Sequence, residues 1–215
     1  MTTIGTIGAG NIGANVARAA IAAGYDVILS NSRGPESLAE LVGELGPQAS
    51  AATPEQAAQH ADLVLVAVPL GKIDQIPPHI LDGKIVMDAN NYYPGRDGRI
   101  PRIDRGEVTT SRLLQEHAPG ARIVKAFNNI PAADIPKDGL PAGTPDRRAL
   151  PIAGDDAAAK LVVADFLNAI GFDAVDVGGL DDSWVVERDT PAYVRRTTAD
   201  ELRALVQNVE RVILS

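Results

Sequence analysis

A glycine-rich segment near the N-terminus carries the clearest chemical signal in the chain. Gly8, Gly10 and Gly13 directly follow an apolar run over residues 3–7 and open an alanine-rich stretch that ends near Gly24. In such a strand–turn–helix, the first glycine permits a tight turn, the second lets a pyrophosphate approach the backbone, and the third lets helix and strand pack closely. The helix start adds unpaired N–H groups and a partial positive charge. The pattern predicts a dinucleotide site formed by Gly8, Gly10, Asn11, Ile12 and Gly13.

The end of the second predicted strand indicates which dinucleotide binds. NAD sites usually carry Asp or Glu there to hold the ribose 2′-hydroxyl, whereas the 2′-phosphate of NADP needs a cation and hydrogen-bond donors. This strand ends in Ser30 and continues with Asn31, Ser32 and Arg33. Arg33 can bind phosphate oxygens while Ser32 and Asn31 donate to them. We therefore predict NADP(H) as the cofactor, and the alternative for Arg33 is a surface turn.

Three further strand ends supply asparagines and small apolar side chains. Ligands on open α/β sheets bind outside the carboxyl ends of the strands, near the point where the strand order reverses. We expect a slot there for the nicotinamide carboxamide and a second ring, and the alternative for each asparagine is a turn cap. The residues predicted to line this slot are Val68, Pro69, Leu70, Asn90, Asn128, Asn129, Ile130 and Pro131.

The order of apolar segments predicts the fold class. Strand-length runs alternate with Ala- and Leu-rich stretches, as expected for βαβ units around a buried parallel sheet. We predict an α/β fold, a Rossmann-type doubly wound, mostly parallel sheet with a small C-terminal helical extension. Thr53, Pro54 and Gln56 have the order of an N-cap, a first-turn proline and a capping box. The predicted strands cover residues 3–7, 26–30, 49–51, 63–68, 85–88, 123–127, 150–153 and 174–177.

The chain is interpreted as an NADP-binding domain over residues 1–177 and a helical extension over residues 178–215 that packs on it. Residues 92–120 form a long connection with one short helix at 111–117, and long ordered connections are often functional. A C-terminal helix is predicted to open at Thr198, with one apolar face that contacts the core or forms a dimer interface. That face comprises Leu202, Leu205, Val206, Val209, Val212 and Ile213.

Composition excludes several kinds of chemistry. The 28 acidic and 20 basic residues give a net charge of −8, which disfavours nucleic acid and acidic membrane surfaces as partners. The chain has no cysteine, so disulfides, thiolate nucleophiles, iron–sulfur clusters and cysteine-type zinc sites are excluded. His60, His79 and His117 are scattered without ligand spacing, and we predict no metal. Signal-peptide regions and membrane-length apolar stretches are missing, so we expect a cytoplasmic protein.

At these residues the chain resembles the NADPH-dependent coenzyme F420 reductases (F420:NADP oxidoreductases) and, more distantly, the NADPH-binding domain of the STEAP metalloreductases. The resemblance covers most of the chain. Besides the glycine segment, it is carried by Ser32-Arg33, Val66–Pro69, Asp88–Asn91, Ile123–Asn128 with Ile130–Ala132, Ala153–Asp156 and Gly178–Leu180. The family and the apolar C-terminal helix together imply a homodimer.

The resemblance implies direct hydride transfer between C4 of the nicotinamide and coenzyme F420, a deazaflavin. The protein then supplies proximity and alignment, and no dedicated acid or base is needed. The sequence has neither a Tyr-x-x-x-Lys pair nor an evident Ser/His/Asp triad, and we assign no catalytic residue. Lys125, Tyr92 and Tyr93 are the only plausible proton donors near the slot, and we predict a structural role for each.

The hydride acceptor stays open at the level of the sequence. Family members carry His-Thr before Ile-Pro-Ala where this chain has Asn128-Asn129, and asparagine does not titrate. The second interpretation is an NADPH-dependent reductase of a flavin, a quinone or a chelated metal. The third is a non-catalytic NADP(H)-sensing module whose slot is covered by a loop or by Trp184 and Tyr193, which otherwise pack the C-terminal extension. Four arginines form either a solvated face or a contact for the anionic tail of coenzyme F420: Arg96, Arg99, Arg102 and Arg105.

Overall fold

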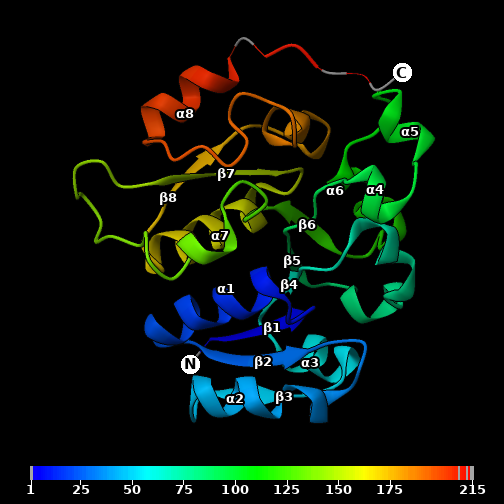
Figure 1. The fold of residues 1–215 in the computed structure, drawn as a ribbon, viewed down its shortest axis with the longest axis vertical. Helices are drawn as coiled ribbons and strands as arrows, with labels where there is room; N and C mark the ends of the chain where they lie inside the picture. Colours follow the sequence, from blue (N-terminus) through cyan, green and yellow to red (C-terminus); the bar gives the residue numbers. More distant parts are fainter. Residues whose placement is uncertain (1, 208, 212, 214–215) are drawn as a thin grey trace.

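An eight-stranded sheet runs through the molecule and carries helices on both faces (Figure 1). The structure is a computed structural model, and it describes residues 2–207, 209–211 and 213. The strand order in space is β3-β2-β1-β4-β5-β6-β7-β8. The strands are β1 (Thr3–Ile7), β2 (Asp26–Ser30), β3 (Ala49–Ala51), β4 (Leu63–Val66), β5 (Ile85–Asp88), β6 (Arg122–Lys125), β7 (Ala149–Gly154) and β8 (Asp173–Asp176).

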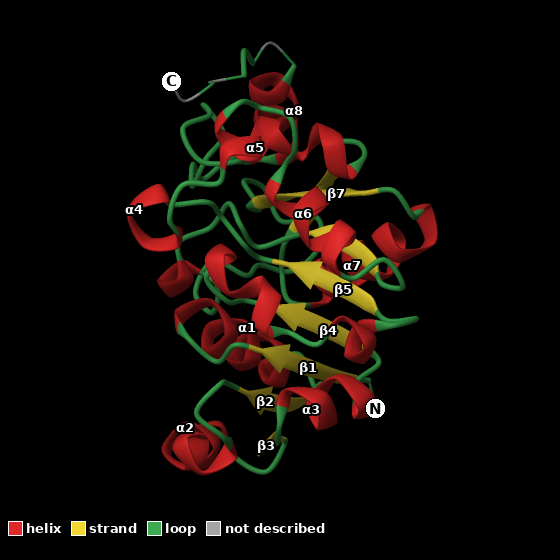
Figure 2. Cartoon of the chain, turned by 90° about the vertical axis from the view of Figure 1, so that its right-hand side faces the viewer, coloured by secondary structure: helices red, strands yellow, loops and turns green. Residues whose placement is uncertain are grey.

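Pairing along the sheet is parallel from β3 to β6, antiparallel between β6 and β7, and parallel again between β7 and β8. The first six strands follow the order 3-2-1-4-5-6 of the Rossmann fold. Figure 2 shows β3, β2, β1, β4 and β5 one above another, with helices on both sides of the sheet. The predicted α/β class and the mostly parallel, doubly wound sheet are therefore confirmed.

Local signals place the helices. Thr53 caps its helix through a complete capping box with Gln56, and Thr198 does the same with Glu201. The helices are α1 (Asn11–Ala22), α2 (Ala39–Leu45), α3 (Pro54–His60), α4 (Pro94–Asp97), α5 (Pro101–Asp104), α6 (Thr110–His117), α7 (Ala157–Ala169) and α8 (Ala199–Val206). Short 3-10 helices are η1 (Pro35–Leu38), η2 (Leu70–Gln75), η3 (Pro78–Leu81), η4 (Ala132–Asp134) and η5 (Leu180–Val186). No described helix is long and apolar enough to cross a membrane.

Successive residues of a strand point to opposite faces of the sheet, so the strands contribute to two separate hydrophobic cores, one on each face. Leu63 and Leu65 pack with α1, α2 and α7, whereas Val64 and Val66 pack with α3, α6 and the short helices η2 and η3. Because α1 and α3 cover opposite faces, the chain diverges at the carboxyl ends of β1 and β4. A crevice at this reversal of strand order is where such sheets bind ligands.

Two strands end earlier than their apolar runs predict. β4 stops at Val66 rather than at Val68, and β6 stops at Lys125 rather than at Phe127. Pro69 has no N–H to continue a ladder, and Phe127 adopts a left-handed conformation with φ of 62° that turns the chain. Residues beyond both stops therefore lie in loops at the crevice.

The C-terminal extension packs on the last two strands. Val186 of η5 and Leu202 of α8 share a small core with Val175 of β8. The prediction of a longer C-terminal helix is wrong, because α8 ends at Val206 and Ile213 is largely exposed. Beyond α8 the chain crosses to the loop after α5, where the Arg211 guanidinium donates to the carbonyls of Gly106 and Val108. Val209 lies outside the helix, and Val212 lies outside the described residues.

Candidate functional site

Two adjoining cavities occupy the crevice at the carboxyl ends of the strands. The outer cavity, about 500 Å³, lies beside β1 and β2 and is lined by Gly8–Gly10, Asn31–Arg33 and residues of η2. The inner cavity, about 380 Å³, lies beside β5 and β6 and is lined by side chains including Ile12, Asn90 and Asn128. Both border Ala67–Pro69, so they form one groove whose volume suits a small-molecule ligand.

The glycine segment has the geometry that its spacing predicts. Gly8 has a φ of 102°, and a Cβ there would lie 2.3 Å from the carbonyl oxygen of Ala67. A Cβ on Gly13 would lie 2.0 Å from the carbonyl oxygen of Gly8, so helix α1 can approach β1 only with glycine at that position. Gly10 faces open space instead, because a Cβ there would meet nothing within 4 Å. Its open side lets a phosphate approach the start of α1.

Cations gather at the outer cavity. Arg33 and Lys72 both line it, and in the described part of the chain neither has an ion-pair partner. Asn31 accepts a hydrogen bond from the N–H of Arg33 at 2.9 Å and donates to Ser37 Oγ at 2.9 Å, so it shapes the turn that presents Ser32 and Arg33. Lys72 was not predicted from the sequence. Its signal is positional, because it follows the end of β4, which lies next to β1.

Most residues predicted for the cofactor site line one cavity or the other. Gly8, Gly10, Asn31, Ser32 and Arg33 line the outer cavity, Asn11, Ile12, Asn90, Asn128 and Ile130 line the inner cavity, and Val68 and Pro69 border both. Four predicted residues line neither: Gly13, Leu70, Asn129 and Pro131. Leu70 is buried, and the Asn129 side chain accepts a hydrogen bond from the N–H of Val194. Pro131 is exposed, so it does not support the groove from within.

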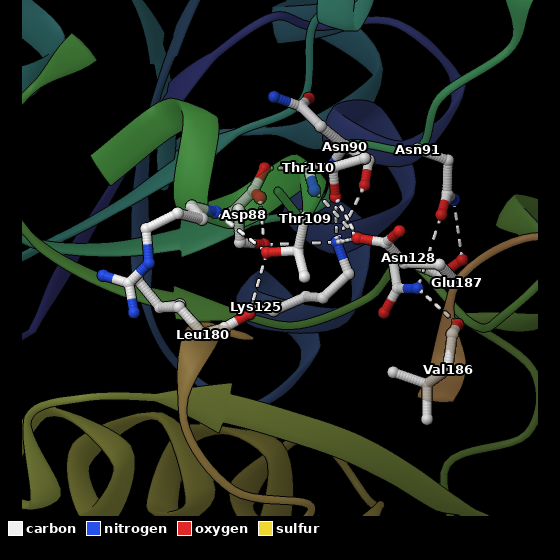
Figure 3. Close-up of polar contacts among 12 residues, drawn as sticks. Asp88, Asn90, Asn91, Thr109, Thr110, Lys125, Asn128, Leu180, Val186 and Glu187 are labelled. Carbon is white, nitrogen blue, oxygen red and sulfur yellow. Dashed lines mark hydrogen bonds and ion pairs between the residues drawn. The ribbon is translucent and has the colours of Figure 1, made fainter. Parts of the chain in front are cut away.

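Two asparagines that line the inner cavity have unpaired amide atoms. Both side-chain polar atoms of Asn90 are buried without a hydrogen-bond partner among the described residues, as is Oδ1 of Asn128. The Asn128 amide nitrogen donates to the carbonyl of Val186 at 2.8 Å, which fixes its orientation (Figure 3). A buried polar atom without a partner costs about 1–3 kcal/mol. A ligand carboxamide, which both donates and accepts, would complete the bonding of Asn90.

A buried charged network holds Asn90 in place (Figure 3). Lys125 Nζ donates to the carbonyl of Asn90 at 3.2 Å and to Thr110 Oγ1 at 2.6 Å, and it lies 3.7 Å from a carboxylate oxygen of Glu187. Asp88 accepts from the Asn90 N–H at 2.9 Å. Burial raises the pKa of Asp88 above its ordinary value, although the charge of Lys125 opposes this. Lys125 is saturated with acceptors, so its role is structural, as predicted.

Two tyrosines from distant parts of the chain meet at the inner cavity. The hydroxyls of Tyr93, after β5, and Tyr193, between η5 and α8, are hydrogen-bonded to each other, and both side chains line the cavity. The structure places Tyr93 at the cavity wall, and the structural role expected for it stays a prediction. Tyr92 is buried and hydrogen-bonded to Asp104, so it is structural. Trp184 lines a separate small cavity and not the inner one.

Asp97 anchors the loop that carries Tyr93. Its carboxylate accepts hydrogen bonds from the N–H groups of Tyr93 at 2.9 Å and Gly71 at 3.3 Å, and from the Arg96 guanidinium. Burial favours the neutral acid, but these hydrogen bonds outweigh it and lower the pKa of Asp97. The ionised carboxylate thus ties the Tyr93 loop to η2 at the groove.

The four arginines of the long connection are paired with carboxylates of this chain. Arg96 pairs with Asp97, and the other three pair with acids in or beside α5 and α6. All four side chains are between 43% and 58% exposed, which matches the solvated-face interpretation. Only Arg96 reaches the inner cavity among the four. The described residues contain no cluster of three or more histidine or acidic side chains that could hold a metal.

Comparison with known proteins agrees with this geometry. Residues 3–92 match the family model described as NADP oxidoreductase, coenzyme F420-dependent. The predicted family resemblance is confirmed. An F420-dependent NADP reductase of Methanothermobacter thermautotrophicus is 27% identical over 213 residues, which span 91% of this chain and 89% of that protein. The family match, the similarity to this reductase and the Rossmann fold together identify the chain as an NADP-dependent oxidoreductase.

Two further relatives differ in how much of their length is shared. Metalloreductase STEAP3 of Rattus norvegicus is 28% identical over 189 residues, which cover 86% of this chain but only 35% of that protein. A solved structure of the hypothetical protein SMa0349 from Sinorhizobium meliloti has a TM-score of 0.80 and 34% identity, and the match covers 92% of this chain and 96% of that one. The fold is thus shared along nearly the whole chain.

Substitution of two glycines separates folding from cofactor binding. Gly13→Ala should lower the free energy of unfolding by at least about 1–3 kcal/mol, because its Cβ collides with the backbone of Gly8. Gly10→Ala, its matched control, should leave that free energy nearly unchanged but raise the Kd for NADPH about tenfold, since the methyl group stands where the phosphates approach. Denaturant titration and fluorescence titration measure the two effects. Unchanged NADPH binding in folded Gly10→Ala would contradict this placement of the pyrophosphate.

The lowered pKa of Asp97 predicts an acid-sensitive contribution to stability. Because the folded-state pKa lies below the ordinary value of 3.8, the contribution is complete above that value and is lost as the pH falls through the folded-state pKa. Asp97→Asn should therefore be less stable than wild type at neutral pH, with the difference shrinking in acid. Urea unfolding over a pH series measures this, with the 98% exposed Asp200 as control in Asp200→Asn. A difference that does not depend on pH would refute the role of the ionised carboxylate.

Proposed function

We propose that this protein transfers a hydride between NADP(H) and the deazaflavin coenzyme F420. The observation that carries the proposal is the division of the groove, with unpaired cations at the outer cavity and an unpaired buried amide on Asn90 at the inner cavity, among the residues that the structure describes. The first suits the phosphates of NADP and the second suits a nicotinamide carboxamide. The match of residues 3–92 to the F420-dependent family supports the identity of the partner.

The residues of the outer cavity fit the adenosine end of NADP. Ser32 and Arg33 are placed to bind the 2′-phosphate, and Arg33 can do so through two parallel hydrogen bonds. Lys72, on the facing wall, adds a second positive charge. The free N–H groups at the start of α1 are placed to receive the pyrophosphate beside Gly10.

The residues of the inner cavity align and shield the reacting ring. Asn90 would fix the carboxamide and so the orientation of the nicotinamide, while Val68, Pro69 and Ile130 give it an apolar wall. When bound, the dinucleotide supplies the hydride and the protein does not take part in that bond exchange. Holding the two rings in the reactive orientation lowers the activation free energy, because much of the entropy loss of bringing them together has already occurred on binding.

A second candidate is the reduction of a flavin, a quinone or a chelated metal. The likeness to STEAP3 favours it, together with the pairing of the four arginines by carboxylates of this chain, which leaves little free positive charge for an anionic tail. A homodimer, a cytoplasmic location and the division at residue 177 are also part of the proposal. Sedimentation at micromolar concentration tests the homodimer.

An acceptor panel tests the proposed reaction. Purified protein is mixed with NADPH or NADH and with coenzyme F420, FMN or a simple quinone, and the absorbance of each chromophore is followed. We expect stoichiometric loss of deazaflavin absorbance with NADPH but not with NADH. Turnover with FMN or quinone alone would select the second candidate. Tight NADPH binding without turnover would instead indicate an NADP(H)-sensing module.

The choice of dinucleotide predicts a selective effect of Arg33→Ala. Hydrogen bonds to charged groups contribute about 1.5–3 kcal/mol, so the Kd for NADPH should rise roughly tenfold to hundredfold. The Kd for NADH should stay the same, because NADH lacks the 2′-phosphate. Arg122→Ala is the control, since Arg122 is the exposed first residue of β6, whereas the groove lies at the carboxyl ends of the strands. Equal Kd values of wild type for NADPH and NADH would refute the role of Arg33.

A further inference from the structure

The Tyr93–Tyr193 pair is a polar feature of the inner cavity that the proposed hydride transfer does not use. The two hydroxyls are hydrogen-bonded, and they line the cavity that also holds the unpaired amide of Asn90. Reduction of a conjugated ring or carbonyl by a hydride also consumes one proton. The site therefore has O–H donors where a proton is required.

We propose that Tyr93 and Tyr193 are catalytic residues that deliver this proton to the acceptor. The inference rests on the proposed function. The acceptor gains a hydride at carbon and a proton from one phenol at its conjugated nitrogen or oxygen. The phenolate left behind regains a proton from the other hydroxyl, which is reprotonated by water. NADPH, acceptor and one solvent proton thus give NADP⁺ and the reduced acceptor, and charge and hydrogen both balance.

Two arginine side chains pack on the ring of Tyr93. The guanidinium carbons of Arg96 and Arg188 lie 4.7 Å and 5.4 Å from the centre of the Tyr93 ring. Cations pack favourably against the face of an aromatic ring, so these two side chains help to hold the Tyr93 ring in place. Arg96 is held by Asp97, and Arg188 by Asp189. Two cations and two carboxylates therefore surround the pair.

The second phenol is held differently. Burial raises the pKa of Tyr193 and its hydrogen bond to Tyr93 adds to this, so Tyr193 keeps its proton at neutral pH. Its position is fixed by the neighbouring Val194, whose N–H donates to the side chain of Asn129. Tyr93 is fixed by Asp97. Both phenols are thus anchored independently of each other, as a proton-transfer pair requires.

A binding experiment tests this location without any acceptor. The nicotinamide ring is positively charged in NADP⁺ and neutral in NADPH. If the phenols border that ring, saturating NADP⁺ should lower the apparent pKa of tyrosinate formation in wild type, and NADPH should not. The ultraviolet absorbance of tyrosinate reports this. The shift should become smaller in Tyr93→Phe and in Tyr193→Phe, vanish when both substitutions are combined, and persist in the control Tyr25→Phe, which alters a ring packed on Phe166.

Steady-state kinetics then tests the proton transfer. General acid catalysis contributes about 10²–10⁴-fold, so kcat should fall by about a hundredfold in each phenylalanine variant while the Kd for NADPH is retained. The solvent deuterium isotope effect should change in both variants and not in Tyr25→Phe. Unchanged kcat and isotope effects in variants of a turning-over protein, or a tyrosinate shift that survives both substitutions, would overturn the inference alone. Absence of wild-type turnover with every acceptor would overturn it together with the proposed function.

Discussion

A buried ammonium group determines how the inner cavity is built. Lys125 has no exposed surface, and an interior charge is tolerated only when opposite charge and hydrogen bonds complete its surroundings. Its partners come from three segments: the carbonyl of Asn90 after β5, two hydroxyls at the start of α6, and Glu187 after η5. Breaking one of these contacts would leave the charge incompletely paired. The segments are therefore fixed together, and Asn90 lies among them.

The same requirement makes the C-terminal extension part of the site. Glu187 contacts both Lys125 and the N–H of Thr110, so it closes the network from the far side. Two further contacts of the extension hold the loop after β6. The Asn128 side chain donates to the carbonyl of Val186, and the Asn129 side chain accepts a hydrogen bond from the N–H of Val194. An extension that packed only on β7 and β8 would bring no side chain to the cavity. These additional contacts are what place Tyr193 there.

The strands and the class of fold could be predicted because their signals are local. Four strands have the predicted bounds: β1, β2, β3 and β5. Their signal is a two-residue alternation or a short apolar run between turn residues, and both patterns can be recognised from neighbouring positions in the sequence. The errors lie where a distant contact decides. β6 ends early because Phe127 turns into the core beside Phe166, and α8 ends early as Arg211 binds the loop after α5. Neither partner is visible from the local pattern.

The candidate site likewise has a part that could be predicted from local sequence and a part that depends on distant contacts. The glycine segment and the Ser32-Arg33 turn are contiguous motifs whose spacing specifies their chemistry, whereas the two tyrosines lie 100 residues apart. The charge around the cofactor also depends on which residues the fold brings together. A net charge of −8 disfavours phosphate polymers, yet a single dinucleotide experiences mainly the groups within about 8 Å, the Debye length at physiological salt. Arg33 and Lys72 are the charged side chains among the described residues that line the outer cavity, and the start of α1 adds a partial positive charge. An acidic protein can therefore hold an anionic cofactor, and only the fold brings Lys72 into that set.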